Sequence, residues 1–182
     1  MAAIPEDDIV LTAGTGEHVD QPSDYVPPVT GGFRIAASKL KALITTKPRA
    51  IVDAIKWSRG QITEPSQSWK GLCQSHCRTA YGLPAWAPSA IEAWRKTPKQ
   101  YRHPGKPEDA PRGALLYYEI GKYGHVAIAT GIKTNDKCLS NDYMRQGRID
   151  YTPRRFPRWG VKYLGWSDWT PYGRIAVGKP VK

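Results

Sequence analysis

Two cysteines stand four positions apart in the stretch WKGLCQSHCRTAYG, residues 69–82. A thiolate is a strong nucleophile, and the partial positive charge at a helix N-terminus stabilises it relative to the thiol. Cys73 lies at the start of a predicted helix and is therefore the candidate nucleophile. Cys77 lies one turn later beside Ala80 and Tyr81, where a small apolar side chain packs, so we expect a core residue there.

A nucleophilic cysteine needs a general base, and four histidines are available: His18, His76, His103 and His125. His18 lies in a Gly- and Pro-rich N-terminal stretch, and His103 lies in a Pro/Gly loop. His76 shares the predicted helix with Cys73 and is not expected to face the sulfur. His125 begins the alternating segment HVAIATG, and a base at a strand end facing a helix N-terminus is a common way to hold a Cys–His pair. A strand histidine taken alone is more often structural, so the order of the elements decides the assignment.

That order resembles the papain-like cell-wall hydrolases of the CHAP and NlpC/P60 families. GLCQ lies on a predicted helix, YGHVAIA on a strand, and SND at the end of the next strand. The most specific part is APRGALLYYEIGKYGHVAIATG, and the resemblance covers about residues 65–170. It implies an α+β, papain-like fold with N-terminal helices packed on an antiparallel sheet, and it implies a cysteine-type peptidoglycan amidase or endopeptidase.

Carried onto this chain, the resemblance makes Cys73 the nucleophile and His125 the general base. A third group, which orients the imidazole, is expected from CLSND, where Ser140 and Asp142 share one strand face and Asn141 the other. We favour Asp142, because its carboxylate would also stabilise an imidazolium, with Asn141 as the alternative. Two features depart from the family pattern: LC stands where DC is common, and the turn GIKTNDK is longer than in many relatives.

Three side chains near these two residues are candidates for binding substrate: Trp69, Gln74 and Tyr123. Trp69 closely precedes the nucleophile, Gln74 follows it, and Tyr123 flanks His125. Further on, RRFPRWGVKYLGWSDW (154–169) mixes basic and aromatic residues, which can stack on sugars or nucleobases. The same pattern fits a hairpin that packs into a core, and we favour packing there.

Metal and cofactor sites are not expected. A zinc set of Cys73, His76, Cys77 and Cys138 has poor geometry, because three of its members fall on one short helix and the chain has no CxxC pair. P-loop, GxGxxG and HExxH motifs are also absent from the sequence. Three cysteines cannot form a disulfide framework in a chain of 182 residues, so at least one is a free thiol.

Charge is unevenly distributed along the chain. The net charge is +11, but residues 1–33 carry −6 and residues 34–182 carry +17. A basic body indicates a polyanionic partner, and we expect bacterial cell-wall peptidoglycan with its anionic polymers; nucleic acid is less expected. The acidic N-terminal stretch is a candidate contact for another protein, such as a neighbour in a phage particle.

Periodicity and turn residues predict helices in the first half of the chain and an antiparallel sheet in the second. An extended or disordered arm is expected at 1–33, followed by one domain at 34–182. Predicted helices are 36–44, 48–60 (ending at Gly60), 72–81 (closed by Gly82) and 89–96 (begun by Ser89 with Glu92). Predicted strands are 114–120, 125–131, 138–142, 148–152, 163–166 and 174–177.

The N-terminus is acidic and lacks the basic and apolar regions of a secretory signal, and no apolar run is long enough to span a membrane. We therefore expect a phage-type lysin that stays in the cytoplasm until lysis releases it, or a virion-associated lysin, acting on the cell wall without contact with a membrane. The alternative is a non-catalytic virion structural or wall-binding protein on the same fold. A basic nucleic-acid binder is a third possibility.

Overall fold

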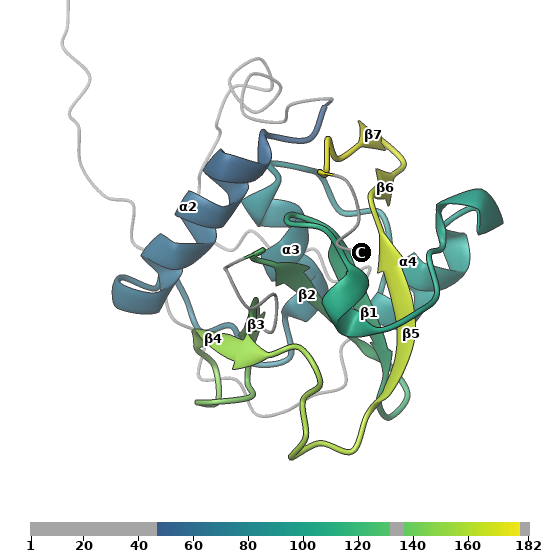
Figure 1. Ribbon diagram of the computed structural model, residues 1–182. Coiled ribbons are helices and arrows are strands. Elements are labelled where there is room, and N and C mark those ends of the chain that lie inside the picture. Colours follow the sequence, from purple (N-terminus) through teal and green to yellow (C-terminus); the bar gives the residue numbers. More distant parts are fainter. Residues whose placement is uncertain (1–46, 132–136, 179–182) are drawn as a thin grey trace, which may run out of the picture.

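The computed structural model describes residues 47–131 and 137–178 of the chain (Figure 1). Its class is α+β, with the helices first and the strands second, as predicted. The helices are α2 (Ile51–Thr63), α3 (Cys73–Ala80) and α4 (Ala90–Lys96), followed by the short 3₁₀ turns η1 (Lys99–Tyr101) and η2 (Pro107–Asp109). The predicted arm at 1–33 and the predicted helix at 36–44 lie outside the described residues.

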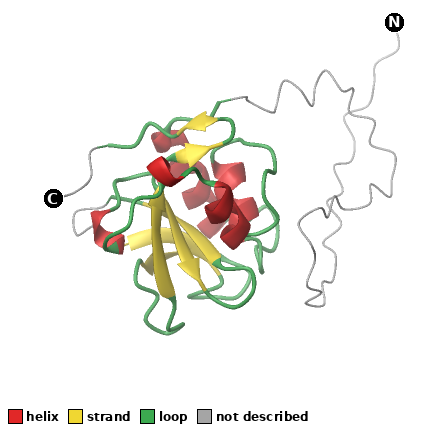
Figure 2. Cartoon of the chain, turned by 90° about the vertical axis from the view of Figure 1, so that its right-hand side faces the viewer, coloured by secondary structure: helices red, strands yellow, loops and turns green. Residues whose placement is uncertain are grey.

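Five strands form one antiparallel sheet in the order β4-β3-β2-β1-β5. Their bounds are β1 (Leu115–Glu119), β2 (His125–Ala129), β3 (Lys137–Asn141), β4 (Ile149–Pro153) and β5 (Lys162–Ser167). A small hairpin, β6 (Trp169–Thr170) and β7 (Gly173–Arg174), follows β5 at one end of the sheet (Figure 2). The sheet therefore follows the predicted strands closely, and only the hairpin differs.

Two of the predicted helix ends are confirmed. Gly82 adopts a left-handed φ of 68°, and its N–H bonds Thr79 O at 2.9 Å, which closes α3. At the start of α4, Ser89 Oγ accepts a hydrogen bond from the Glu92 N–H at 3.3 Å. Local side-chain and backbone chemistry was sufficient to place both boundaries.

Two predicted boundaries are wrong. Helix α2 does not end at Gly60, because Gly60 stays out of the left-handed region and its carbonyl accepts the Glu64 N–H at 2.9 Å. The predicted strand at 174–177 contributes only Arg174 to β7. Beyond it, Ile175 is buried and its N–H bonds Asp168 O at 2.7 Å, so the chain packs back toward the end of β5 instead of extending the hairpin.

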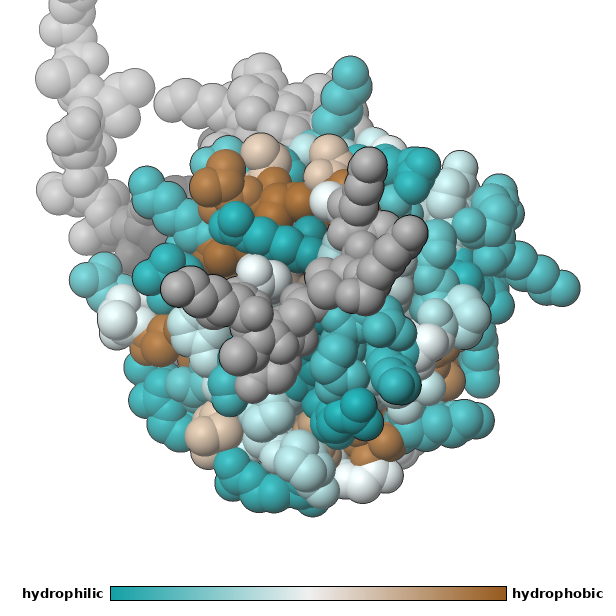
Figure 3. All heavy atoms as spheres, in the orientation of Figure 1, coloured by the Kyte–Doolittle hydropathy of each residue, from teal (hydrophilic) through white to brown (hydrophobic). Residues whose placement is uncertain are grey.

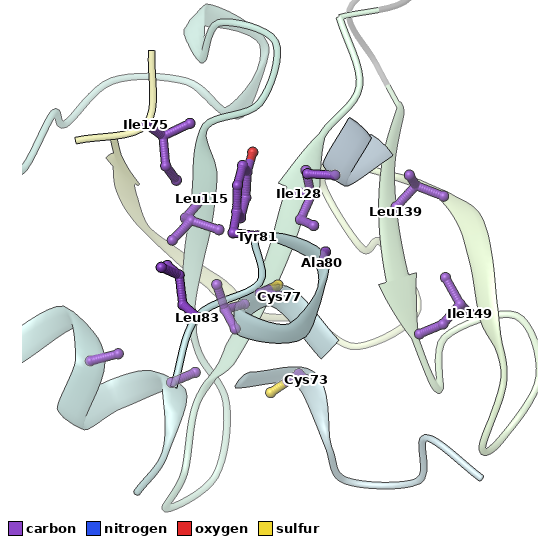
Figure 4. Packing of buried hydrophobic residues seen from close by; sticks show 14 of the residues in the cluster. Cys73, Cys77, Ala80, Tyr81, Leu83, Leu115, Ile128, Leu139, Ile149 and Ile175 are labelled. Carbon is purple, nitrogen blue, oxygen red and sulfur yellow. The ribbon is translucent and has the colours of Figure 1, made fainter. Parts of the chain in front are cut away.

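Apolar side chains cover both faces of the sheet, because successive strand residues point to opposite sides. The helix-side core joins α2, α3 and α4 to residues that include Leu115, Tyr117, Val126, Ile128 and Leu139. The far-side core includes Leu116, Tyr118, Ala127, Ala129, Cys138, Phe156 and Trp166. Figure 4 shows Cys77 pointing from α3 into the helix-side core, as expected for a core cysteine. Cys73, the first residue of α3, belongs to the same core.

The molecular face seen in Figure 3 is predominantly hydrophilic, with apolar residues confined to small areas. None of the described helices is both long enough and apolar enough to pass through a bilayer.

Candidate functional site

Cys73 is the first residue of α3, and the loop before it is held in place by hydrogen bonds. Gly71, with a left-handed φ of 68°, donates its N–H to Asp142 Oδ2 at 2.8 Å, and Leu72 donates to Trp69 O at 3.0 Å. The Cys73 side chain is only 9% exposed. This arrangement sets the sulfur at the junction between the start of α3 and the sheet.

Burial governs the charge state of the thiol. It raises the pKa of Cys73 to about 11, although hydrogen bonding from the backbone of Val126 and Gln74 favours the thiolate. The nearby Asp142 carboxylate raises this pKa further. The helix N-terminus alone therefore does not produce a resting thiolate, contrary to the expectation from the position of Cys73.

His125 begins β2 directly after Gly124, whose left-handed φ of 67° and close approach to Ile91 leave little room for a larger residue. The imidazole is 5% exposed, and its ring centroid lies 5.0 Å from that of Trp159 and 5.2 Å from that of Phe156. Burial lowers the pKa of His125 to about 3, so the imidazole is neutral at pH 7.

A hydrogen bond to Ser140 holds this imidazole. His125 Nε2 lies 2.6 Å from Ser140 Oγ, and the same hydroxyl lies 3.3 Å from Asn141 O. A hydroxyl both donates and accepts, so Nε2 carries the proton where the hydroxyl donates to Asn141 O, and Nδ1 is then the basic nitrogen. Nδ1 is not among the buried unpaired atoms of the described residues.

Cys73 and His125 meet through the backbone of Val126. The sulfur interacts with Val126, the residue after His125, and Val126 packs in the helix-side core with Cys73. The His125 ring instead contacts Tyr118 and Phe156 of the far-side core. Within the described residues no hydrogen bond joins the sulfur to the imidazole. The two side chains therefore lie on opposite faces of the sheet, and His125 does not face the start of α3 as the sequence predicted.

The third residue beside the imidazole is Ser140, whereas the expected candidates Asp142 and Asn141 bind elsewhere. Asp142 leaves the strand with a φ of 66° and accepts the N–H groups of Gly71 (2.8 Å) and Gly147 (2.7 Å). Asn141 Nδ2 donates to Trp69 O at 2.6 Å. Both side chains therefore anchor the loop that leads into α3. Ser140 was already placed on the same predicted strand face as Asp142, and this was the available signal for it.

The three expected substrate-binding residues differ in their surroundings. Trp69 is fully buried, donates from Nε1 to Gln61 Oε1 at 3.3 Å, and packs edge-on against Trp57, so it contributes to the core. Tyr123 is half-buried, and the Lys122 ammonium lies 5.3 Å from its ring centre. Gln74 is 7% exposed, and its Nε2 and Oε1 have no hydrogen-bond partner among the described residues. Gln74 thus retains unused binding capacity beside Cys73.

Metal ligation finds no support in the part of the chain that the structure describes. No group of three or more His, Cys, Asp or Glu side chains is placed there to hold an ion. The three cysteines are free thiols, and Cys138 Sγ lies 3.1 Å from Thr152 Oγ1 on the far side of the sheet.

No family model and no curated protein matches this chain. Inference about its function therefore starts from its own side chains.

Proposed function

We propose that the chain is a cysteine-type peptidoglycan hydrolase with a papain-like fold of the CHAP and NlpC/P60 type, in which Cys73 is the nucleophile and His125 the general base. The observation that carries the proposal is the 2.6 Å contact between His125 Nε2 and Ser140 Oγ, together with the contact of the Cys73 sulfur with Val126, the residue after His125. In the proposal Ser140 accepts the Nε2 proton, which leaves Nδ1 to take a proton.

The proposed reaction starts from an uncharged thiol at Cys73 and an uncharged imidazole at His125. The proposal requires a rearrangement that brings together two side chains which lie on opposite faces of the sheet in this structure. As Cys73 Sγ then attacks the carbonyl carbon of a wall peptide bond, its proton passes to His125 Nδ1, and the imidazolium protonates the departing amine. Water hydrolyses the resulting thioester and regenerates the thiol. The N–H of Cys73, at the first turn of α3, supplies one donor for the oxyanion, and the unpartnered amide of Gln74 is available to bind the substrate backbone.

Charge supports an anionic polymer as the partner. Residues 34–182 carry +17, which attracts anionic wall polymers through a salt-dependent interaction. The proposal includes action on the cell wall as a free lysin or as a component of a phage particle, with the acidic residues 1–33 as the contact for a neighbouring virion protein.

A second candidate is a non-catalytic virion or wall-binding protein on the same fold. The near-complete burial of Cys73 (9% exposed) and His125 (5% exposed) favours it, because a substrate carbonyl must reach both side chains. As an enzyme, the protein would have to expose Cys73 and His125 when substrate binds. A wall-binding protein would not require this rearrangement.

The test is digestion of purified peptidoglycan, with released fragments identified by mass spectrometry. The hydrolase predicts release by the wild-type chain, a fall of about 10²- to 10⁴-fold in His125→Ala, and loss of release in Cys73→Ala, which cannot form the thioester. Cys77→Ala, on the same helix, is the matched control and should retain activity, with folding checked by thermal unfolding. Wall binding without any released fragment would identify the binding module, and tight salt-sensitive DNA binding without wall affinity would identify a nucleic-acid binder.

A further inference from the structure

Positive charge is concentrated in one segment outside the candidate site, residues 95–106, which we call the basic segment. It runs from the last turn of α4, through η1, to the residue before η2 (Figure 1). Residues 93–107 contain no Asp or Glu. The basic segment holds five cations, namely Arg95, Lys96, Lys99, Arg102 and Lys106. Four of them are exposed and Arg102 is half-buried, so their charge is presented to the solvent.

Ion pairing neutralises little of this charge. Of the five cations, only Arg95 forms an ion pair with a described residue, to Glu92 at 2.5 Å. Lys99 and Lys106 have no such partner in the part of the chain that the structure describes. The Lys96 ammonium donates to a backbone carbonyl, which leaves its charge in place. Most of the charge is therefore available to an external anion.

Arg102 is fixed with part of its guanidinium open to solvent. Its Nε donates to Thr97 O at 2.7 Å and its Nη2 donates to Arg95 O at 2.7 Å. Its Nη1 bonds no described residue and is not one of their buried unpartnered atoms, so Nη1 is accessible. An arginine that is already held in one rotamer loses little freedom when it binds an anion.

The aromatic rings of this surface are already covered by other side chains. The Arg102 guanidinium lies 5.6 Å from the ring centre of Trp94, and that ring also packs on Tyr117, with centroids 5.2 Å apart. The Arg174 guanidinium lies 5.1 Å from the ring centre of Tyr101. Proteins that bind single-stranded nucleic acid stack its bases on open aromatic faces. The basic segment therefore fits a partner that is recognised by its anionic groups alone.

The surroundings of the segment also disfavour a membrane or a rigid duplex. A bilayer surface requires exposed apolar side chains, and the large ones among the described residues lie elsewhere, at Val52, Leu72 and Met144. The cations belong to successive short elements, since Lys96 ends α4, Lys99 begins η1 and Lys106 precedes η2. A flexible chain can adapt to charges placed in this way, whereas the phosphates of a duplex have fixed positions.

We propose that the basic segment binds a flexible polyanion whose polyol units are joined by phosphodiesters, a class of polymer found in bacterial walls. Its phosphate oxygens accept hydrogen bonds from the three lysine ammonium groups and from Arg102 Nη1. The choice of a wall polymer rests on the proposed function, whereas the exposed, unpaired charge does not. The bound polymer holds the protein at the wall independently of any reaction at Cys73.

The experiment measures binding of the full chain to fluorescently labelled poly(glycerol phosphate), freed of peptidoglycan, between about 20 and 200 mM salt. For flexible single strands, the slope of log K against log salt is about −0.7 per phosphate contact. Lys99→Gln combined with Lys106→Gln removes two contacts, so the slope should become less negative by about 1.4. Affinity at low salt should fall about 30-fold, from the usual contribution of a lysine beside an anionic surface.

The matched control is Lys56→Gln combined with Arg59→Gln, which removes the same charge from two exposed positions of α2. Figure 1 shows α2 well apart from α4, so the control should leave the slope unchanged. Thermal unfolding checks that both double variants are folded. Equal weakening by the two would show a general attraction to the basic body and would overturn the proposal.

Absence of binding at low salt also overturns the proposal. Tighter binding of duplex DNA at the same phosphate concentration, lost in the Lys99 and Lys106 double variant, overturns it by assigning the surface to nucleic acid. The polymer contains no peptide bond, so its binding is independent of hydrolysis. Performed with Cys73→Ala, the same titration supports the surface whether or not the wild-type chain digests wall.

Discussion

The imidazole of His125 and the hydroxyl of Ser140 are joined by a 2.6 Å hydrogen bond that links the first residue of β2 to β3. The two strands pair only further along, at Ile128–Leu139 and Ala129–Cys138, so this bond bridges the separating ends of two strands. The hydroxyl also lies 3.3 Å from Asn141 O, and the direction in which it bonds Nε2 sets which imidazole nitrogen carries the proton.

Ser140→Ala is predicted to lower kcat about tenfold with little change in KM, since it removes one buried hydrogen bond of roughly 1.4 kcal/mol without altering a substrate contact. Nitrogen-15 NMR of the histidine ring should show the Nε2–H tautomer, which the proposal requires, in the wild-type chain and its loss in the variant. Ser167→Ala is the matched control, because Ser167 is also buried in the sheet and its Oγ accepts from the Trp169 N–H. Unchanged kcat together with an unchanged tautomer would remove the positioning role of Ser140.

Alkylation of Cys73 by iodoacetamide is predicted to be slow at pH 7 and to rise about tenfold per pH unit up to about pH 10, because burial raises its pKa to about 11. The measurement is a rate profile from mass spectrometry of the peptide that contains Cys73. Cys77 and Cys138, which are more deeply buried, should react more slowly still. An alkylation rate that levels off below pH 8 would show that Cys73 is a thiolate at rest and would contradict the uncharged thiol.

Element order was predictable because helical and strand periods differ, and because Gly82 and Ser89 carry their own end signals. The partner of His125 was not predictable to the same degree. Alternation along CLSND narrowed the choice to a face, but the left-handed φ of Asp142 takes its side chain off that face and toward Gly71. Strand β3 ends at Asn141, so Ser140 stays on the strand face that contacts the His125 imidazole and Asp142 does not.

The burial of Cys73 was the second property that could not be predicted from the local sequence. The start of α3 predicts a stabilised thiolate at Cys73, yet desolvation by the surrounding core reverses the direction of the pKa shift. The pairing of His103 with Trp166, two residues far apart in the sequence, is likewise a product of tertiary packing.

Arg154→Met is predicted to lower the free energy of unfolding by about 3 kcal/mol, since it removes a buried guanidinium that donates hydrogen bonds to three backbone carbonyls. Arg154 donates to Lys137 O, Pro107 O and Ala110 O at 2.8–2.9 Å. Its neighbour Arg155 is exposed and pairs with Glu108, so Arg155→Met should cost less than about 1 kcal/mol. Urea unfolding of both variants makes the comparison, and equal losses would contradict a structural role for the buried guanidinium.

The pH dependence of stability should depend on His76, which is fully buried between Trp57 and Trp69 with Nε2 3.1 Å from Ser58 Oγ. Burial, and secondarily the charge of His125, lowers the pKa of His76 to about 3. In the unfolded chain the pKa of His76 has its ordinary value of 6.5, so between about pH 6.5 and pH 3 the unfolded chain binds a proton at this residue and the folded chain does not. Stability is therefore complete above about pH 6.5 and falls as the pH drops toward 3, by roughly 1.4 kcal/mol per unit for this residue.

His76→Gln removes that titration and keeps a group able to bond Ser58. Its destabilisation relative to wild type should shrink by about 2 kcal/mol between about pH 7.5 and pH 5 in urea unfolding, because only the wild-type chain then loses stability through position 76. Ser58→Ala removes the same hydrogen bond without removing the titration, so its effect should be equal at both pH values. If His76→Gln behaved like Ser58→Ala, the imidazole would already be able to accept a proton in the folded chain, and the buried neutral state of His76 would be wrong.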